Sequence, residues 1–218
     1  RKLQREKNRL EEFTSIVSHD LRSPLNVARG NARLAQESCE SEHLDTIVEA
    51  HERMEALIED LLVLARSGER IDETEWTDFG RLVERCWNTV ETADATLVGE
   101  ADGTIRADPS RLQQLLENLV RNAVEHGGDD VTVTIDCLDG GFYVADDGPG
   151  IPADDRESVF DVGYSTVDDG TGFGLRIVDQ VAEAHEWNVT AAESEGGGAR
   201  FEVTGVETEA ASVEGSRT

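Results

Sequence analysis

The sequence of 218 residues contains only two lysines, Lys2 and Lys7, and all its other cationic residues besides histidine are arginine. Enzymes that bind ATP through a Walker A lysine, or through the strand-borne lysine of protein kinases, are therefore excluded. The three cysteines are far apart and odd in number, which argues against a disulfide framework and a cysteine zinc site. No apolar run reaches the roughly 18 residues that a membrane-spanning helix needs.

Positive charge is also scarce, because 47 acidic residues stand against 20 basic ones and give a net charge of −27. This balance excludes a basic nucleic-acid-binding surface and disfavours an anionic membrane surface. Together with the lack of lysine it predicts adaptation to very high salt, the alternative being an ordinary acidic protein. The sequence has neither an initiator methionine nor a signal-like start, so we expect a cytoplasmic portion of a longer protein, attached to a membrane only through a missing N-terminal part, if at all.

Residues 1–67 predict an antiparallel pair of helices joined by a short polar connection. The second helix has apolar spacings of three and four that are typical of a bundle seam. These seam positions are Leu44, Ile47, His51, Met54, Ile58, Leu61 and Ala65. Two amphipathic helices do not bury their own apolar stripes, so we expect a homodimer through residues 1–67 that forms a four-helix bundle. A hairpin packed on its own C-terminal domain is the alternative.

Residues 68–75 are polar and predict a linker, and residues 76–207 predict a mixed domain of helices and strands. We expect helices over 79–90, 109–126 and 173–184, with Asp108 or Ser110 as the cap of the second. Strands are expected over 104–107, 131–138, 141–145, 188–192 and 199–206. Residues 208–218 have no periodicity and predict a flexible tail.

The segment SHDLRSPL carries an exposed histidine in the first predicted helix. His19 lies opposite the apolar stripe, where its imidazole is able to act as a nucleophile. Asp20 is placed to accept a proton or to fix the ring tautomer, and Ser23 lies one turn further on the same face. Pro24 predicts a kink just beyond the histidine. Taken alone, an exposed histidine beside an aspartate is most often an ordinary surface residue.

Two further segments combine polar side chains with a regular element. Asn118 and Asn122 share one face of a helix, and an amide oxygen suits Mg²⁺, although the spacing alone favours an ordinary pair on the helix surface. In VADDGPGIP, Asp146 ends a strand, where its carboxylate can accept a hydrogen bond from an exocyclic amine such as that of adenine. Gly148 and Gly150 then form a turn that a planar ligand can approach closely, or a plain surface turn.

The segment DDGTGFGLRIV predicts a glycine-rich loop that leads into a helix N-terminus. Gly170, Gly172 and Gly174 make this loop flexible, so that it can close onto the helix. The backbone N–H groups and the helix dipole there can hold phosphates without a lysine. Glycine-rich loops are common, so this signal is weak by itself.

Taken together and in this order, the segments resemble a sensor histidine kinase of a two-component system. SHDLRSPL looks like the phosphoacceptor box, and ENLVRNA, DDGPGIP, VFDVGYST and GTGFGL look like the N, G1, F and G2 boxes of the ATP-binding domain. SEGGGARFEV is similar to the final glycine-rich strand pair. The resemblance implies an α+β fold, in which a helical hairpin precedes a catalytic ATP-binding domain of the GHKL type, built as an α/β sandwich with a mixed sheet layered on helices.

The resemblance also implies a role for each matched residue. His19 would receive the γ-phosphoryl group of ATP, with Asp20 as general base, and pass it to an aspartate of a response regulator receiver domain. Asn122 would bind Mg²⁺ and Asn118 would lie beside the phosphates, while Asp146 would bind the adenine N6 amine. The remaining residues implied in ATP binding are Gly148, Gly150, Arg156, Gly170, Thr171, Gly172, Gly174 and Leu175, with residues 161–171 as a mobile lid.

The sequence departs from the family pattern at three positions. Glu125 and His126 stand where many members have lysine and tyrosine, which implies weaker or salt-compensated ATP binding. Ser23 stands where threonine or asparagine often supports phosphatase activity. Two alternatives remain: an ATPase of the same superfold, although Asn118 occupies the place of its catalytic glutamate, and a degenerate kinase that acts as a dimeric scaffold.

Overall fold

The structure, a computed structural model, describes residues 25, 28–35, 44, 46–48, 50–51, 54, 58, 71, 73–90, 92, 94–99, 101–128, 130–161, 164 and 172–209. The chain divides into two compact units, Arg1–Ser67 and Gly68–Thr218. Among the described residues, no helix combines the length and the apolar character that crossing a membrane requires.

The described residues of the first unit, between positions 25 and 58, are all helical. Ala32 and Ile58 are buried, whereas Ile47 and Met54 keep 42% and 38% of their surface exposed. Ile47, Met54 and Ile58 are seam positions of the second predicted helix. The apolar face is therefore only partly covered within one chain.

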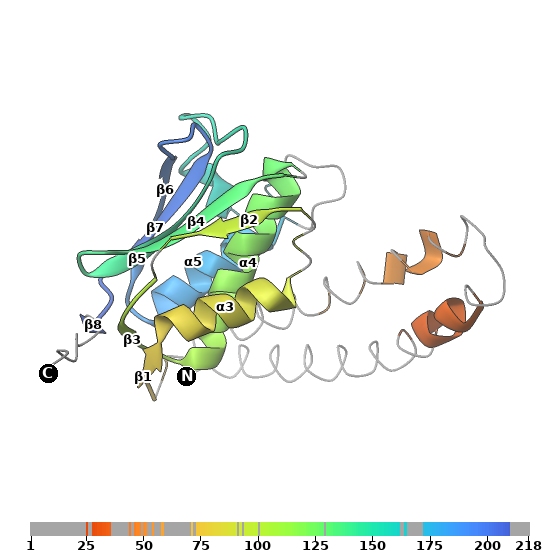
Figure 1. The fold of residues 1–218 in the computed structure, drawn as a ribbon, viewed down its shortest axis with the longest axis horizontal. Helices are drawn as coiled ribbons and strands as arrows, with labels where there is room; N and C mark the ends of the chain where they lie inside the picture. The colour runs from red at the N-terminus through yellow and green to blue at the C-terminus, as the bar shows by residue number, and fades with distance from the viewer. Residues whose placement is uncertain are drawn as a thin grey trace, which may run out of the picture. The chain divides into compact units, whose positions relative to one another are not determined.

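The second unit is built on a mixed five-stranded sheet with helices on one face (Figure 1). The strands run in the order β2 (Thr96–Val98), β4 (Thr132–Leu138), β5 (Gly141–Asp146), β7 (Ala199–Thr204) and β6 (Asn188–Glu193). Only β2 and β4 are parallel, and the other neighbours are antiparallel. The helices are α3 (Phe79–Thr89), α4 (Pro109–Gly127) and α5 (Gly174–Ala184), and η1 (Ser158–Phe160) is a short 3-10 helix.

A smaller sheet of three strands has the order β1 (Glu75–Asp78), β3 (Thr104–Ala107) and β8 (Thr208–Glu209). Strand β3 leads directly into α4, whose N-cap is Asp108: its carboxylate accepts hydrogen bonds from the backbone N–H groups of Ser110 and Arg111. Such a cap satisfies N–H groups that have no partner inside the helix, and Pro109 suits the first helical position. Together they fix where α4 begins.

The core lies between the large sheet and its helices. Alternate residues of β5 face it, and Phe142 packs against Phe79 of α3 with ring centroids 4.9 Å apart. Trp187 contacts Phe142 edge to face. The same alternation along β5 decides which side chain at its end turns toward the helices.

The α+β class and the mixed sheet with helices are confirmed, and the observed bounds of the expected helices and strands differ by at most two residues. The tail expected over 208–218 needs a correction, because Thr208 and Glu209 form β8 and pair with Ile105 and Thr104. Main-chain pairing needs no side-chain periodicity, so the pattern could not reveal it. The strands β1 and β2 were not expected, and β1 begins at Glu75, the last residue of the predicted linker.

Candidate functional site

Asp146 ends β5 in the row of side chains that faces the core, after Phe142 and Val144. It is 8% exposed. Its Oδ1 accepts two hydrogen bonds, from the backbone N–H groups of Gly148 and Ala199, each at 3.0 Å. Burial raises the pKa of Asp146, and these two N–H groups partly oppose the rise. The other oxygen, Oδ2, has no hydrogen-bond partner in the described part of the chain and is left for a ligand.

The neighbouring Asp147 points the other way and has a structural role. Its carboxylate accepts a hydrogen bond of 2.7 Å from the backbone N–H of Thr132, at the start of β4. This bond lowers the pKa of Asp147. Of the two adjacent aspartates, Asp146 is therefore the one whose carboxylate is placed to bind a ligand.

The turn after β5 contacts two other backbone segments so closely that side chains are excluded. A Cβ on Gly148 would lie 2.6 Å from Cα of Gly127, at the end of α4. Gly150 has a φ of +72°, and a Cβ there would lie 2.7 Å from the carbonyl oxygen of Gly197. The turn is thus held between α4 and the β6–β7 connection, and packing against the protein backbone requires glycine at both positions. The approach of a planar ligand to this turn stays a prediction.

The two asparagines of α4 differ in their surroundings. Asn118 is buried, and its Nδ2 donates a hydrogen bond of 2.8 Å to the carbonyl of Gln114. A Cβ on Gly174 would lie 3.3 Å from Asn118 Oδ1, so this oxygen faces the start of α5. Asn122 is half-buried one turn later, and its side chain has no hydrogen-bond partner among the residues that the structure describes.

The start of α5 offers a site for an anion. Gly172 has a φ of +67°, and the N-cap residue Phe173 makes no side-chain hydrogen bond to the helix. The first turn, which contains Gly174 and Leu175, has no acidic residue. A helix N-terminus whose N-cap side chain makes no hydrogen bond to the helix favours a phosphate through its N–H groups and its dipole.

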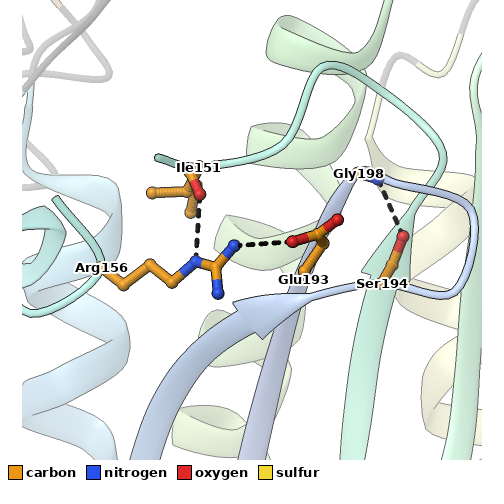
Figure 2. Close-up of polar contacts among 5 residues, drawn as sticks. All are labelled: Ile151, Arg156, Glu193, Ser194 and Gly198. Carbon is orange, nitrogen blue, oxygen red and sulfur yellow. Dashed lines mark hydrogen bonds and ion pairs between the residues drawn. The ribbon is translucent and has the colours of Figure 1, made fainter. Parts of the chain in front are cut away.

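Arg156 is partly exposed and contacts two protein groups, as Figure 2 shows. Its Nε donates to the carbonyl of Ile151 at 3.0 Å, and its terminal nitrogen pairs with Glu193 at 3.1 Å. These contacts use two of the five N–H donors of the guanidinium, and a contact of Arg156 with a phosphate stays a prediction.

Several of the predicted site residues lie on α4, the β5 turn and the start of α5, and these elements approach one another at Asn118 and Gly174 and at Gly127 and Gly148. These predicted residues are Asn118, Asn122, Asp146, Gly148, Gly150, Gly172, Gly174 and Leu175. Five others, His19, Asp20, Ser23, Gly170 and Thr171, lie outside the described residues. Ser194 and Gly198, which contact Asp146, were missed, and their only signal in the sequence was the run SEGGG.

Two families match this chain. Residues 107–208 match the family described as Histidine kinase-, DNA gyrase B-, and HSP90-like ATPase, and residues 9–70 match the His Kinase A (phospho-acceptor) domain. The first match contains α4, the β5 turn and α5. The second contains the segment around His19.

Similar proteins are sensor kinases. Sensor protein IrlS of Burkholderia pseudomallei (strain K96243) is 32% identical over 199 residues, covering 81% of this chain and 43% of the relative. Sensor histidine kinase CpxA of Escherichia coli (strain K12) is 30% identical over 219 residues, covering 88% of this chain and 46% of the relative.

Among solved structures, full-length ShkA in complex with AMPPNP has a TM-score of 0.70 and 29% identity, covering 92% of this chain and 47% of that chain. The chain therefore spans about half the length of the relatives it matches. With both families matched in this order, the chain carries a His Kinase A (phospho-acceptor) domain followed by a histidine kinase-like ATPase domain, and it is similar to sensor histidine kinases.

Proposed function

We propose that the chain binds Mg²⁺-ATP in the unit Gly68–Thr218 and transfers the γ-phosphoryl group to His19. The bond between the γ-phosphorus and ADP breaks, a phosphorus–nitrogen bond to the imidazole forms, and the imidazole proton passes to Asp20. The phosphoryl group then moves to an aspartate of a response regulator receiver domain. The observation that carries this proposal is the buried Asp146 at the end of β5, whose Oδ2 has no hydrogen-bond partner among the described residues. The same unit contains the N-terminus of α5, where the N-cap side chain makes no hydrogen bond to the helix.

The nucleotide would bind with its base at Asp146 and its phosphates at α5. The adenine N6 amine donates to the carboxylate, and Gly148 and Gly150 let the base approach the backbone. Gly172, Gly174 and Leu175 would present their backbone N–H groups to the phosphates. The resemblance adds Gly170 and Thr171, which lie outside the described residues, to this set. ShkA, whose solved structure contains AMPPNP, supports an ATP-like ligand for this fold.

The residues present fit a magnesium ion. Asn122 is half-buried without a hydrogen-bond partner among the described residues, and an amide oxygen is a suitable ligand for a hard cation. Mg²⁺ would offset the negative charge of the phosphates. Asn118 instead is held by Gln114 and orients its oxygen toward Gly174, beside the phosphates.

The assembly and setting form part of the same proposal. Exposed Ile47 and Met54 support a homodimer through residues 1–67 that forms a four-helix bundle. The chain would be the cytoplasmic portion of a sensor, since relatives about twice its length are sensor kinases. The net charge of −27 supports function in very high salt, and it speaks against nucleic acid as a partner.

A glutamate-activated ATPase is disfavoured by the surroundings of Glu117. Its carboxylate accepts a hydrogen bond of 2.7 Å from Gln113 Nε2, and its charge helps raise the pKa of the Cys86 thiol of α3, after the larger effect of burial. Glu117 therefore faces α3, whereas Asn118 faces α5. Glu117, the carboxylate adjacent to Asn118, is therefore not placed to activate water beside the phosphates.

Labelled ATP distinguishes the three functions. With ATP carrying ³²P at the γ position, a kinase yields acid-labile phosphoprotein, an ATPase yields free phosphate only, and a scaffold yields neither. We expect His19→Gln to abolish phosphoprotein while ATP binding is retained, because the histidine lies outside the nucleotide-binding unit. His51→Leu is the matched control on a seam position, and it should keep labelling. Phosphoprotein formed by His19→Gln at the wild-type rate would contradict the assignment.

A further inference from the structure

The connection between β6 and β7 encloses Asp146 through a buried hydroxyl group. Ser194, which follows β6, is 9% exposed. Its Oγ donates a hydrogen bond of 2.6 Å to the carbonyl of Asp146. The same Oγ accepts a hydrogen bond of 2.9 Å from the N–H of Gly198, as Figure 2 shows. The hydroxyl thus satisfies two buried backbone groups that no water can reach easily.

The same connection also fixes the carboxylate of Asp146. The N–H of Ala199 donates to Oδ1, and Gly198 leaves room for this contact. A Cβ on Gly198 would lie 2.3 Å from both the carbonyl oxygen and Oδ1 of Asp146. The backbone and the side chain of Asp146 are therefore positioned by one short segment, which lies 48 residues away in sequence.

The residue before Ser194 holds the other end of the β5 turn. Glu193 pairs with Arg156, whose Nε donates to the carbonyl of Ile151 (Figure 2). Two consecutive residues, Glu193 and Ser194, thus hold both ends of the segment 146–151. Partly exposed ion pairs contribute little to stability. The hydrogen bonds of the buried Ser194 hydroxyl therefore position the segment more strongly than the Arg156–Glu193 pair does.

We propose that Ser194 is a positioning residue for recognition of the adenine base, and that the Arg156–Glu193 pair assists it. The inference rests on the proposed function, in which Oδ2 of Asp146 accepts the N6 amine. A hydrogen bond of this kind weakens steeply with misalignment. Loosening Asp146 therefore reduces selection of a 6-aminopurine, while the phosphates, bound at α4 and α5, keep their contacts.

The test compares two nucleotides in the full chain with Mg²⁺ and high salt. ATP is measured against purine riboside triphosphate, which lacks only the exocyclic amine, by calorimetric titration. Since a hydrogen bond to a charged group gives about a tenfold preference or more, we expect the wild type to prefer ATP by at least about tenfold. Ser194→Ala should reduce this preference to about threefold or less, with purine riboside triphosphate bound almost as before.

Two further variants separate positioning from stability. Val83→Ala removes buried apolar atoms on α3, far along the chain from the β5 turn, and should lower the melting temperature without changing the ATP preference. Arg156→Met keeps the aliphatic stem but loses both contacts, and its partial exposure makes folding robust; the preference should fall here too, by a smaller factor.

The outcomes separate the inference from the function on which it rests. A wild type without preference for ATP overturns the role of Asp146, and the inference with it. If Ser194→Ala keeps the wild-type preference for ATP, the inference alone is overturned. The same holds if Ser194→Ala lowers the affinity for ATP and for purine riboside triphosphate by the same factor. If Ser194→Ala does not fold, Arg156→Met provides the test. An unchanged preference for ATP in Arg156→Met overturns the inference that Glu193 and Ser194 hold both ends of the segment 146–151.

Discussion

Replacing Asp146 by asparagine tests base recognition at its most specific point. Two backbone N–H groups, of Gly148 and Ala199, donate to Oδ1 of Asp146. In Asp146→Asn the amide must keep its carbonyl oxygen at this position, because its NH₂ group would otherwise face two donors. The NH₂ group is thereby forced to the position of Oδ2, where it faces the N6 amine of adenine. A donor then meets a donor.

The expected loss of ATP affinity follows from two terms. A hydrogen bond between the amine and a carboxylate is lost, and two desolvated donors are left without partners, which together cost about 3 kcal/mol. At 1.4 kcal/mol for each factor of ten, ATP affinity should fall by about a hundredfold. Inosine triphosphate has a carbonyl oxygen at C6 instead of the amine, so its binding should improve in the same variant.

The fold of this variant should survive. Burial raises the pKa of Asp146, so the ionised carboxylate costs stability at pH values above that pKa, and the cost disappears as the pH falls toward the unfolded value of about 3.9. A neutral isostere removes the cost, so at pH 7 Asp146→Asn should melt no lower than the wild type. Titration calorimetry with both nucleotides checks the expected change in affinity, and thermal melting checks the expected stability. A variant that still prefers ATP over inosine triphosphate would refute the reasoning.

Three other perturbations test separate parts of the molecule. Asn122→Ala should abolish the dependence of ATP affinity on Mg²⁺, measured by titration with and without the ion; an unchanged dependence would remove Asn122 from the metal site. His185 accepts a hydrogen bond from the Asp108 N–H through Nε2, its Nδ1 lies 2.8 Å from the carbonyl of Val181, and its pKa is lowered by burial. The stability that neutral His185 provides is complete above its unfolded pKa of about 6.5 and is lost as pH falls below that value. The difference in melting temperature between wild type and His185→Phe should therefore shrink from pH 7.5 to 5.5, and a constant difference would contradict this. Finally, screening lengths of about 30 Å at 0.01 M and about 3 Å at 1 M predict that melting temperature and ATP affinity both rise with KCl; values that stay flat from about 0.05 to 3 M would refute the salt dependence.

Most of the fold was predictable wherever a side-chain pattern or a cap defines an element. Helix α4 was expected from Pro109 onward because Asp108 is a capping residue and Pro109 suits the first turn. The strands β1, β2 and β8 were not predicted. Each is at most four residues long, and main-chain pairing to a strand distant in sequence is what defines it. Such pairing leaves too little periodicity to read.

The site was predictable to the extent that its chemistry lies in local segments. A carboxylate at a strand end, followed by glycines, was enough to single out Asp146. The partners that fix this carboxylate were not predictable, because Ser194 and Ala199 reach it across about 50 residues of sequence. Arg156 was assigned to the phosphates from its position alone, and its contacts with Ile151 and Glu193 depend on how β6 passes the β5 turn.

Because Asp146 is buried, the recognition of the base and the binding of the phosphates should differ in how strongly dissolved ions affect them. Counter-ions screen exposed charges strongly and buried hydrogen-bonded groups much less. The choice of base, made at a carboxylate that is 8% exposed, is thereby insulated from ionic strength. Any effect of salt on ATP binding has to enter through the phosphates and through exposed acidic residues of α4 such as Glu125. Surface acidity can thus change how tightly a nucleotide is held without changing which nucleotide is selected.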